Sequence, residues 1–301
     1  MLEFKLTRFA PTPSGFLHIG NIYSFIITHH LAKKHGAKVL LRIDDLDRER
    51  YKPRFVQDIF DSLDFLEIPY DLGPRDLTDF EQHHAQIHRL PLYNQALEEL
   101  RNKKVLFACD CSRKKIEKMN PKGYYTGFCL RRNLPFDQTE ITWRIKAKMH
   151  MDVPFKELNL GIVNGKLPGI LTDFVVRKKD TMPSYQLTSL VDDIHYGVDL
   201  IVRGKDLWGS TIAQVYLSKF LPENNFAGNT FYHHPLIQGP NSQKLSKSSD
   251  VTSIQLLRKT GKKKEEIFGM IAEAIGLEQR PKNLEEFGGL LIPSPSIDKL
   301  F

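Results

Sequence analysis

Residues 8–21 read Arg-Phe-Ala-Pro-Thr-Pro-Ser-Gly-Phe-Leu-His-Ile-Gly-Asn and connect two segments of different periodicity. Residues 4–10 include a short apolar run that predicts a buried strand, whereas residues 22–35 repeat apolar side chains at the helical period. The prolines and glycines between them predict a tight, extended turn that leads directly into the helix. Such a turn directs backbone N–H groups and a helix N-terminus at one point, which is a natural seat for a phosphate.

His18 lies in this turn, where its imidazole can add a hydrogen-bond donor to an anionic oxygen. The turn taken alone is also compatible with an ordinary strand-to-helix connection, because single glycine-rich turns are weak evidence. A second stretch, Lys-Leu-Ser-Lys-Ser at 244–248, is by itself compatible with a solvated basic loop. Together the two stretches predict that the turn and the lysines bind one triphosphate.

Length and composition place the chain among globular proteins with an apolar core. Its 301 residues are 41% hydrophobic and 26% charged, which is enough for one large domain or two small ones. No apolar run approaches the length of a membrane span and the N-terminus lacks a secretion signal, so we expect a cytoplasmic protein that does not cross a membrane. The formal charge of +7 suits a polyanionic partner such as RNA, although many basic proteins bind no nucleic acid.

Strand and helix patterns alternate after the first turn. Residues 37–43 predict a buried parallel strand that ends in Asp44-Asp45-Leu46-Asp47, and Pro53 opens a helix to about residue 66. A second buried strand at 197–203 is followed by a helix to about residue 220. This order predicts an α/β fold with a doubly wound parallel sheet, in which side chains at the carboxyl ends of the strands face the ligand crevice.

The stretches at 8–21 and 244–248 together resemble the two signature motifs of class I aminoacyl-tRNA synthetases. The residues of the first stretch resemble those of the glutamyl and glutaminyl branch of that family. The first departs slightly by ending His-Ile-Gly-Asn, and the second has Leu where Met is common. The resemblance extends from Arg8 to about Ser248 and implies a Rossmann-type catalytic domain. It also implies that ATP, accompanied by Mg²⁺, activates an amino acid as its adenylate.

The resemblance further implies that the catalytic domain is interrupted by an insertion. We expect the Rossmann-type domain to comprise residues 1–106 and 175–240, with an inserted zinc-binding module of the acceptor-stem type at 107–174. Residues 241–301 are expected to hold the lysine signature loop and a short helical stalk. The 54 residues after Lys247 are too few for another large core, so no anticodon-binding domain is expected.

Charged residues at the ends of the predicted strands suit a free amino acid. An ammonium binds a carboxylate, and a carboxylate binds arginine, best in a bidentate fashion. Asp44 is the candidate for the α-ammonium, with a capping role as the alternative; Arg8 and Arg203 are candidates for the carboxylates, with surface ion pairs as the alternative. The resemblance assigns six positions to the amino-acid substrate: Arg8, Ala10, Thr12, Asp44, Tyr185 and Arg203.

Asp44 leaves the choice of amino acid open between two. Glutamate-specific members of the family usually carry Glu at this position and glutaminyl-tRNA synthetases tend to carry Asp, whereas Ala10-Pro11-Thr12-Pro13 follows the glutamate wording. An arginine aimed at a side-chain carboxylate would reject the neutral amide, because the arginine would be left with an uncompensated charge. We therefore favour glutamate and keep glutamine as the alternative.

The nucleotide site is expected in the same crevice. Adenylate formation needs alignment and positive charge at the phosphate oxygens more than covalent chemistry from the protein. Gly20 would let the nucleotide lie against bare backbone, and the Gly- and Pro-containing segment before Lys247 predicts a loop that closes over ATP. The resemblance assigns ATP binding to His18, Gly20, Asn21 and Lys247, and catalysis to His18, Lys244 and Lys247.

All three cysteines fall between positions 109 and 129, as Cys109-Asp-Cys111 followed by Cys129. Thiols gathered in this way in a cytosolic protein favour a zinc site over disulfides or scattered buried thiols. The fourth ligand is open: Tyr125 has the spacing used by one subgroup of the family, and Tyr124, Asp110 or a water molecule compete with it. We expect one structural Zn²⁺ on Cys109, Cys111, Tyr125 and Cys129.

The short C-terminal part and the cysteine cluster resemble the shortened paralogues of the glutamyl enzyme, the glutamyl-queuosine tRNA(Asp) synthetases. This resemblance implies that a monomer activates glutamate without tRNA and transfers it to the queuosine base at the wobble position of tRNA(Asp). A truncated conventional glutamyl- or glutaminyl-tRNA synthetase, which would require tRNA, is one alternative. A non-catalytic relative that binds RNA or an amino acid is another.

Overall fold

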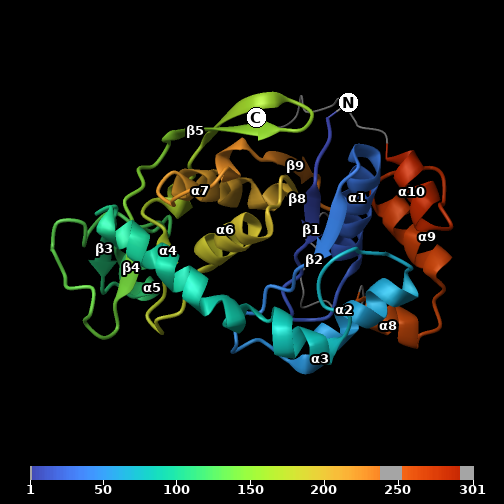
Figure 1. The fold of residues 1–301 in the computed structure, drawn as a ribbon, viewed down its shortest axis with the longest axis horizontal. Helices are drawn as coiled ribbons and strands as arrows, with labels where there is room; N and C mark the ends of the chain where they lie inside the picture. Colours follow the sequence, from blue (N-terminus) through green and yellow to red (C-terminus); the bar gives the residue numbers. More distant parts are fainter. Residues whose placement is uncertain (1, 238–252, 292–301) are drawn as a thin grey trace. The chain divides into compact units, whose positions relative to one another are not determined.

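The computed structural model describes residues 2–237 and 253–291 (Figure 1). The chain divides into two compact units: the first comprises Met1–His88, Asp199–Lys205 and Phe231–Phe301, and the second comprises Arg89–Val198 and Asp206–Thr230. The domain boundaries expected from the sequence, at residues 107, 175 and 241, stay a prediction. None of the helices described is both long and apolar enough to cross a membrane.

The first unit contains parallel strands with helices between and after them. Its strands and α-helices are β1 (Leu6–Phe9), α1 (Ile19–His35), β2 (Lys38–Leu41), α2 (Pro53–Phe65), α3 (Leu77–Asp79), β8 (Leu200–Gly204), β9 (Thr230–His234), α8 (Ile254–Lys259), α9 (Lys264–Ala274) and α10 (Leu284–Leu290). A π-helical turn (Phe80–His84) and a 3₁₀ turn (Gln86–Arg89) follow α3.

The pairing of β1 and β2 is parallel, with Arg8 opposite Leu40 in the register. All four residues of β1 are buried, as expected for a parallel strand covered on both faces. β8 contacts β1, and the carboxylate of Asp199 accepts hydrogen bonds from the N–H groups of Lys5 and Leu6 at 2.9–3.0 Å. These strands, with α1 beside them (Figure 1), confirm the expected α/β fold with a parallel sheet.

α1 begins three residues earlier than the apolar period predicts, because the signature turn itself caps the helix. The Nδ1 atom of His18 accepts the N–H of Gly20 (3.1 Å), and the side-chain oxygen of Asn21 accepts the N–H of His18 (3.1 Å). This reciprocal pair satisfies two of the N–H groups that a helix start leaves without intrahelical partners. The helix ends at Gly36, whose φ of 75° is the left-handed conformation that glycine adopts without strain.

The last helices of the first unit pack against α1. α9 and α10 both contact it, and the rings of Phe268 and Phe287 are completely buried. Gly288 permits the close approach of α10, because a Cβ atom there would lie 2.7 Å from the Nδ1 atom of His30. The helices α9 and α10, which follow the lysine signature in the sequence, therefore contribute to the core of the first unit.

The second unit combines antiparallel strands with three α-helices of ten or more residues. Its strands and α-helices are α4 (Leu90–Asn102), β3 (Leu106–Cys109), α5 (Arg113–Met119), β4 (Thr142–Ile145), β5 (Asp152–Glu157), β6 (Gly161–Lys166), β7 (Val175–Arg177), α6 (Tyr185–Tyr196) and α7 (Trp208–Ser218). β3, β4 and β7 form an antiparallel sheet in that order, and β5 pairs with β6 as a hairpin. Short 3₁₀ turns cover Gly169–Leu171, Lys205–Leu207 and Phe226–Gly228.

A buried ion pair ties α4 to α6 within the second unit. The guanidinium of Arg89, at the residue before α4, grips the carboxylate of Asp192 with contacts of 2.7 and 3.1 Å. The hydroxyl of Tyr93 donates to the same carboxylate at 2.7 Å. All three side chains are buried, so the charge of Asp192 is compensated by donors from the neighbouring helix.

Candidate active site

The carboxyl ends of β1 and β2 are held together by backbone hydrogen bonds. The N–H of Arg42 donates to the carbonyl of Phe9, and the N–H of Asp44 donates to the carbonyl of Pro11, both at 2.9 Å. The segments that follow the two strands therefore run side by side. This arrangement brings Asp44 to Ala10 and Thr12, three of the six residues predicted to contact the amino acid.

Asp44 is clamped by an arginine that the sequence reading missed. The Nε and Nη2 atoms of Arg42 donate to the two carboxylate oxygens at 2.7 and 3.0 Å, and the side chains are 2% and 8% exposed. Alternation in an extended chain was the available signal, because residues two apart share one face. A carboxylate offers about four acceptor sites, so it can bind more than one donor group at a time.

Arg8 and Arg203 are both buried, which excludes the alternative of surface ion pairs for them. Arg8 projects from β1, and its Nη1 atom donates to the carbonyl of Val202 (3.1 Å), the residue before Arg203 on β8. The guanidinium of Arg203 lies 5.8 Å from the ring centroid of Phe231. Tyr185 belongs to the second unit, where it is the first residue of α6 and has an exposed ring.

His18 has a defined orientation in the signature turn. Because its Nδ1 atom accepts the N–H of Gly20, a neutral imidazole carries its proton on Nε2. Gly20 has a steric reason to be glycine, since a Cβ atom would lie 3.0 Å from the imidazole. The turn therefore presents an oriented ring at the N-terminus of α1, where backbone N–H groups and the helix dipole favour an anion.

The lysine signature lies outside the described residues, and so do the predicted residues Lys244 and Lys247. The chain after it meets the signature turn directly. Ser253 forms an isolated antiparallel bridge with His18, and the N–H of Ile254 donates to the carbonyl of Leu17 at 2.7 Å. Six positions along the sequence separate Lys247 from Ser253, which contacts the turn.

The three cysteines converge in the second unit, as the sequence predicts. Their Sγ atoms all lie within 4.8 Å of one another, all three residues are buried, and the Sγ atoms of Cys111 and Cys129 are 3.6 Å apart. A tetrahedral Zn²⁺ with Zn–S bonds of about 2.3 Å requires sulfur atoms about 3.8 Å apart. The cluster therefore fits a zinc ion without rearrangement of the backbone.

Two side chains compete for the fourth ligand position. Tyr125 is buried, accepts the N–H of Cys129 on its hydroxyl oxygen at 2.7 Å, and has the Arg144 guanidinium 4.0 Å from its ring centroid. The Oδ1 atom of Asp110 lies 3.4 Å from the Sγ atom of Cys129 but is paired with Arg132 at 2.7 Å.

The groups of the cluster differ in acidity. The hydrogen bond from Arg132 lowers the pKa of Asp110 to about 2, and interactions with Tyr125 and Arg144 lower the pKa of Cys109 in spite of its burial. Burial raises the pKa of Tyr125 and, together with Cys109, raises the pKa of Cys111 to about 12. A bound cation reverses this tendency and holds its ligands as anions.

Comparison with known proteins supplies the family. The family of tRNA synthetases class I (E and Q), catalytic domain, matches residues 6–286. This chain belongs to that family. The match covers both the signature turn and the cysteine cluster.

Two curated relatives and one solved structure illustrate the relationship. Glutamate–tRNA ligase 1 of Nitrosococcus oceani is 31% identical over 265 residues, which cover 85% of this chain and 53% of that protein. Glutamyl-Q tRNA(Asp) synthetase of Acinetobacter baylyi is 30% identical over 279 residues, which cover 93% of this chain and 89% of that protein. A crystal structure of a glutamate tRNA ligase from Elizabethkingia meningosepticum shares the fold, with a TM-score of 0.73 at 21% identity, over 95% of this chain and 64% of that chain. The synthetase domain thus spans about half the length of the glutamate–tRNA ligase but most of the glutamyl-Q enzyme.

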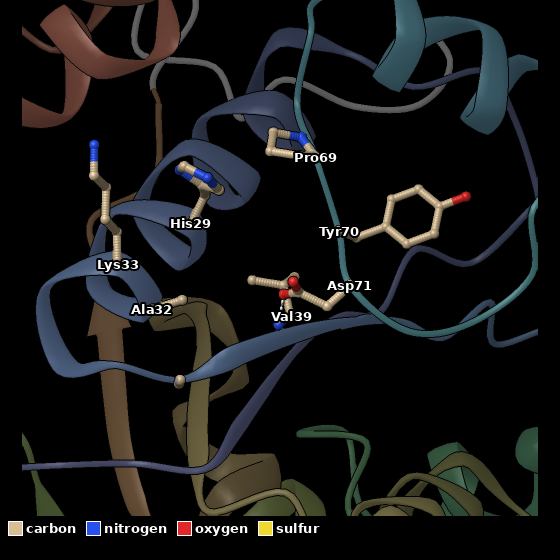
Figure 2. Close-up of a pocket in the computed structure, with 8 residues that line it drawn as sticks. His29, Ala32, Lys33, Val39, Pro69, Tyr70 and Asp71 are labelled. Atoms are coloured by element: carbon tan, nitrogen blue, oxygen red, sulfur yellow. Dashed lines mark hydrogen bonds between the residues drawn. The ribbon is translucent and has the colours of Figure 1, made fainter.

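A small pocket of about 130 Å³ lies elsewhere in the first unit of the synthetase domain. His29 and Lys33 from α1 line it together with Tyr70 and Asp71 from the segment after α2, as Figure 2 shows. None of the predicted site residues lines this pocket. Its polar groups already have structural roles, because Asp71 accepts the N–H of Val39 at 2.7 Å and Lys33 pairs with Glu285.

Proposed function

We propose that this synthetase domain activates glutamate with ATP and transfers it to the queuosine base of tRNA(Asp). The α-ammonium of glutamate binds Asp44, and a buried arginine, Arg8 or Arg203, receives the side-chain carboxylate. An oxygen of the α-carboxylate then attacks the α-phosphorus of ATP. The bond from this phosphorus to the bridging oxygen of the leaving group breaks, and glutamyl-adenylate and pyrophosphate form.

The observation that carries the proposal is the buried charge pattern at the carboxyl ends of β1 and β2. The carboxylate of Asp44 is clamped by Arg42, the backbone N–H of Asp44 donates to the carbonyl of Pro11, and the buried residue Arg8 belongs to the neighbouring strand β1. Buried charges are costly unless an opposite charge compensates them. A buried carboxylate and buried guanidinium groups are complementary to glutamate, which carries one ammonium and two carboxylates. Arg42 then serves to orient Asp44 for the ammonium.

The nucleotide is proposed to bind at the signature turn. The Nε2 proton of His18 donates to a phosphate oxygen, while Gly20, which has no side chain, and Asn21 let the phosphates approach the N-terminus of α1, whose dipole favours an anion. Lys244 and Lys247 supply positive charge to the leaving pyrophosphate. The six-residue tether from Ser253 to Lys247 spans at most about 20 Å when extended, which permits this role. Mg²⁺ that enters with ATP would neutralise part of the phosphate charge.

The acceptor is proposed from the relatives. The chain matches most of the length of a protein named for glutamyl-Q tRNA(Asp) synthesis, whereas it matches about half of a glutamate–tRNA ligase. The second unit, with a structural Zn²⁺ on the three cysteines and Tyr125, is proposed to bind the RNA. Conventional charging of a glutamate tRNA is the second candidate, because relatives of that name are as similar in sequence.

Pyrophosphate exchange tests the reaction and its dependence on tRNA. Purified protein is assayed with glutamate, glutamine or aspartate, each with and without tRNA. Of the three amino acids, we expect only glutamate to support exchange, and we expect this exchange to occur without tRNA. Exchange only in the presence of tRNA favours the conventional enzyme, and exchange only with glutamine assigns the other amino acid and makes Asp44 its cause. Absence of exchange under every condition contradicts the proposed activation step.

A further inference from the structure

Asp58 is a buried carboxylate of α2 that binds two segments far apart in the sequence. Its Oδ2 atom accepts the N–H of Leu17, in the signature turn, at 3.1 Å. Its Oδ1 atom accepts the Nη2 of Arg258, on α8, at 2.7 Å. The Asp58 side chain is 1% exposed and that of Arg258 is 20% exposed, so water has little access to the pair.

Leu17 is also bound directly to α8. Its carbonyl accepts the N–H of Ile254, the first residue of that helix, and the neighbouring His18 bridges to Ser253. Ile254 and Arg258 are four residues apart, so they lie on the same side of α8 and face the same turn. Both backbone polar groups of Leu17 are thus occupied, one by Asp58 and one by α8.

These contacts form a closed ring of hydrogen bonds around the residue that precedes His18. The ring runs from Leu17 to Asp58, from Asp58 to Arg258, along α8 to Ile254, and back to Leu17. Leu17 is held through both its N–H and its carbonyl group. The backbone of the adjacent His18 therefore cannot move without breaking the buried, charge-assisted hydrogen bond from Leu17 to Asp58 or the hydrogen bond from Ile254 to Leu17. Within residues 2–237 and 253–291, the hydrogen bonds and ion pairs of the Asp58 and Arg258 side chains join them to Leu17, to Asp61 and to each other, and neither Leu17 nor Asp61 is predicted to bind ATP or glutamate.

We infer that Asp58 and Arg258 are positioning residues that hold the signature turn against the start of α8 and thereby set the place of the His18 imidazole. The inference rests on the proposed adenylation. A group displaced by about 1 Å from its productive place loses on the order of a hundredfold in rate, so such a pair acts on turnover more than on substrate binding. We therefore expect the pair to affect kcat for exchange while the KM for glutamate changes little.

The test compares variants of the pair in pyrophosphate exchange with glutamate. Arg258→Met removes the charge and keeps the apolar part of the side chain. Arg258→Lys keeps the charge but lacks the planar guanidinium with its several N–H donors. Asp61→Asn is the matched control, because Asp61 lies on the same helix, faces Arg258 at 3.5 Å and is 42% exposed. We expect Arg258→Met to lower kcat at least tenfold, Arg258→Lys to recover part of the loss, and Asp61→Asn to stay within about twofold of the parent protein.

A second variant guards against misfolding of the first. Ile254→Pro removes the one N–H that donates to Leu17, at the first position of a helix, where proline is tolerated; Ile254→Val controls for the smaller buried side chain. We expect Ile254→Pro to lower kcat at least fivefold relative to Ile254→Val, with unchanged KM for glutamate.

The outcomes separate this inference from the proposed function. Folded Arg258→Met and Ile254→Pro that exchange at the parent rate overturn the inference alone. Loss of the cooperative unfolding transition in every variant also overturns it, because the ring is then only structural. A parent protein that exchanges nothing overturns the proposed function and this inference together.

Discussion

At the scale of single residues, the Arg42–Asp44 pair is the feature that a one-residue reading of the sequence overlooks. An isolated buried carboxylate would take up a proton, because burial disfavours its charged form. Arg42 compensates the charge of Asp44 with two hydrogen bonds in a fixed plane. The acceptor that is proposed to bind the substrate ammonium is therefore both charged and oriented before substrate arrives.

Replacement of Arg42 by methionine should weaken both stability and substrate binding. The remaining carboxylate would be buried without its partner, and breaking such a pair costs about 3–5 kcal/mol. We expect the free energy of unfolding in urea to fall by about 3 kcal/mol, and the KM for glutamate in exchange to rise at least tenfold.

Arg50→Met is the control for Arg42→Met, since Arg50 is 72% exposed and pairs with Asp47 at 3.3 Å. Exposed pairs contribute about 0–1 kcal/mol, so this variant should unfold like the parent. Equal effects of the two substitutions on KM would remove Arg42 from the amino-acid site.

At the scale of elements, the cysteine cluster connects the end of β3 to the segment that follows α5. Cys109 is the last residue of β3, and Cys111 lies between that strand and α5, whereas Cys129 comes after the helix. Burial of three thiols side by side raises the pKa of Cys111, which disfavours the thiolate that a metal needs. A divalent cation removes this cost and would join elements that otherwise share only a small apolar core.

Metal analysis separates the candidates for the fourth ligand. We expect about one Zn²⁺ per purified chain, and clearly less in Cys129→Ser. Tyr125→Phe should also lose zinc to a competing chelator faster than the parent, whereas Asp110→Asn should retain it. Zinc loss in Asp110→Asn but not in Tyr125→Phe would assign the carboxylate. Thermal unfolding with and without chelator checks whether the ion stabilises the fold.

At the scale of the whole molecule, the excess of positive charge is the property that belongs to no single site. The formal charge is +7, from 43 lysines and arginines against 36 acidic residues. A protein that neutralises phosphates releases counterions from the nucleic acid, so its affinity falls as salt rises. Formation of the adenylate without tRNA involves no nucleic acid, so it lacks the salt dependence that comes from counterion release.

Salt should therefore separate the two proposed half-reactions. We expect the association constant for tRNA to fall at least tenfold between about 50 and 200 mM salt. Glutamate-dependent exchange without tRNA should change by less than about threefold over the same range. Filter binding and exchange assays measure the two quantities on one preparation. A tRNA affinity that is insensitive to salt would contradict a phosphate-based interface.

The sequence by itself determined the local structure that short-range forces dictate. Apolar periodicity located β1, β2, α1, α2 and α7 to within a few residues, because strand and helix patterns need only neighbours along the chain. The signature turn and the spacing of the cysteines also indicated the family and the cluster. The start of α1 was predicted late, since capping by His18 is not an apolar signal.

Only the tertiary structure decided which partner each buried charge has. The partner of Asp44 is Arg42, two positions away in the sequence. The partner of Asp58 is Arg258, 200 positions away, and the partner of Arg89 is Asp192, 103 positions away. The physical reason is that a charge taken out of water must be compensated by whatever group the packing brings within about 3 Å, and packing depends on the whole chain. The residue types at the strand ends predicted which charged groups the site contains. The orientation of these groups depends on contacts with residues far away in the sequence, which no local pattern contains.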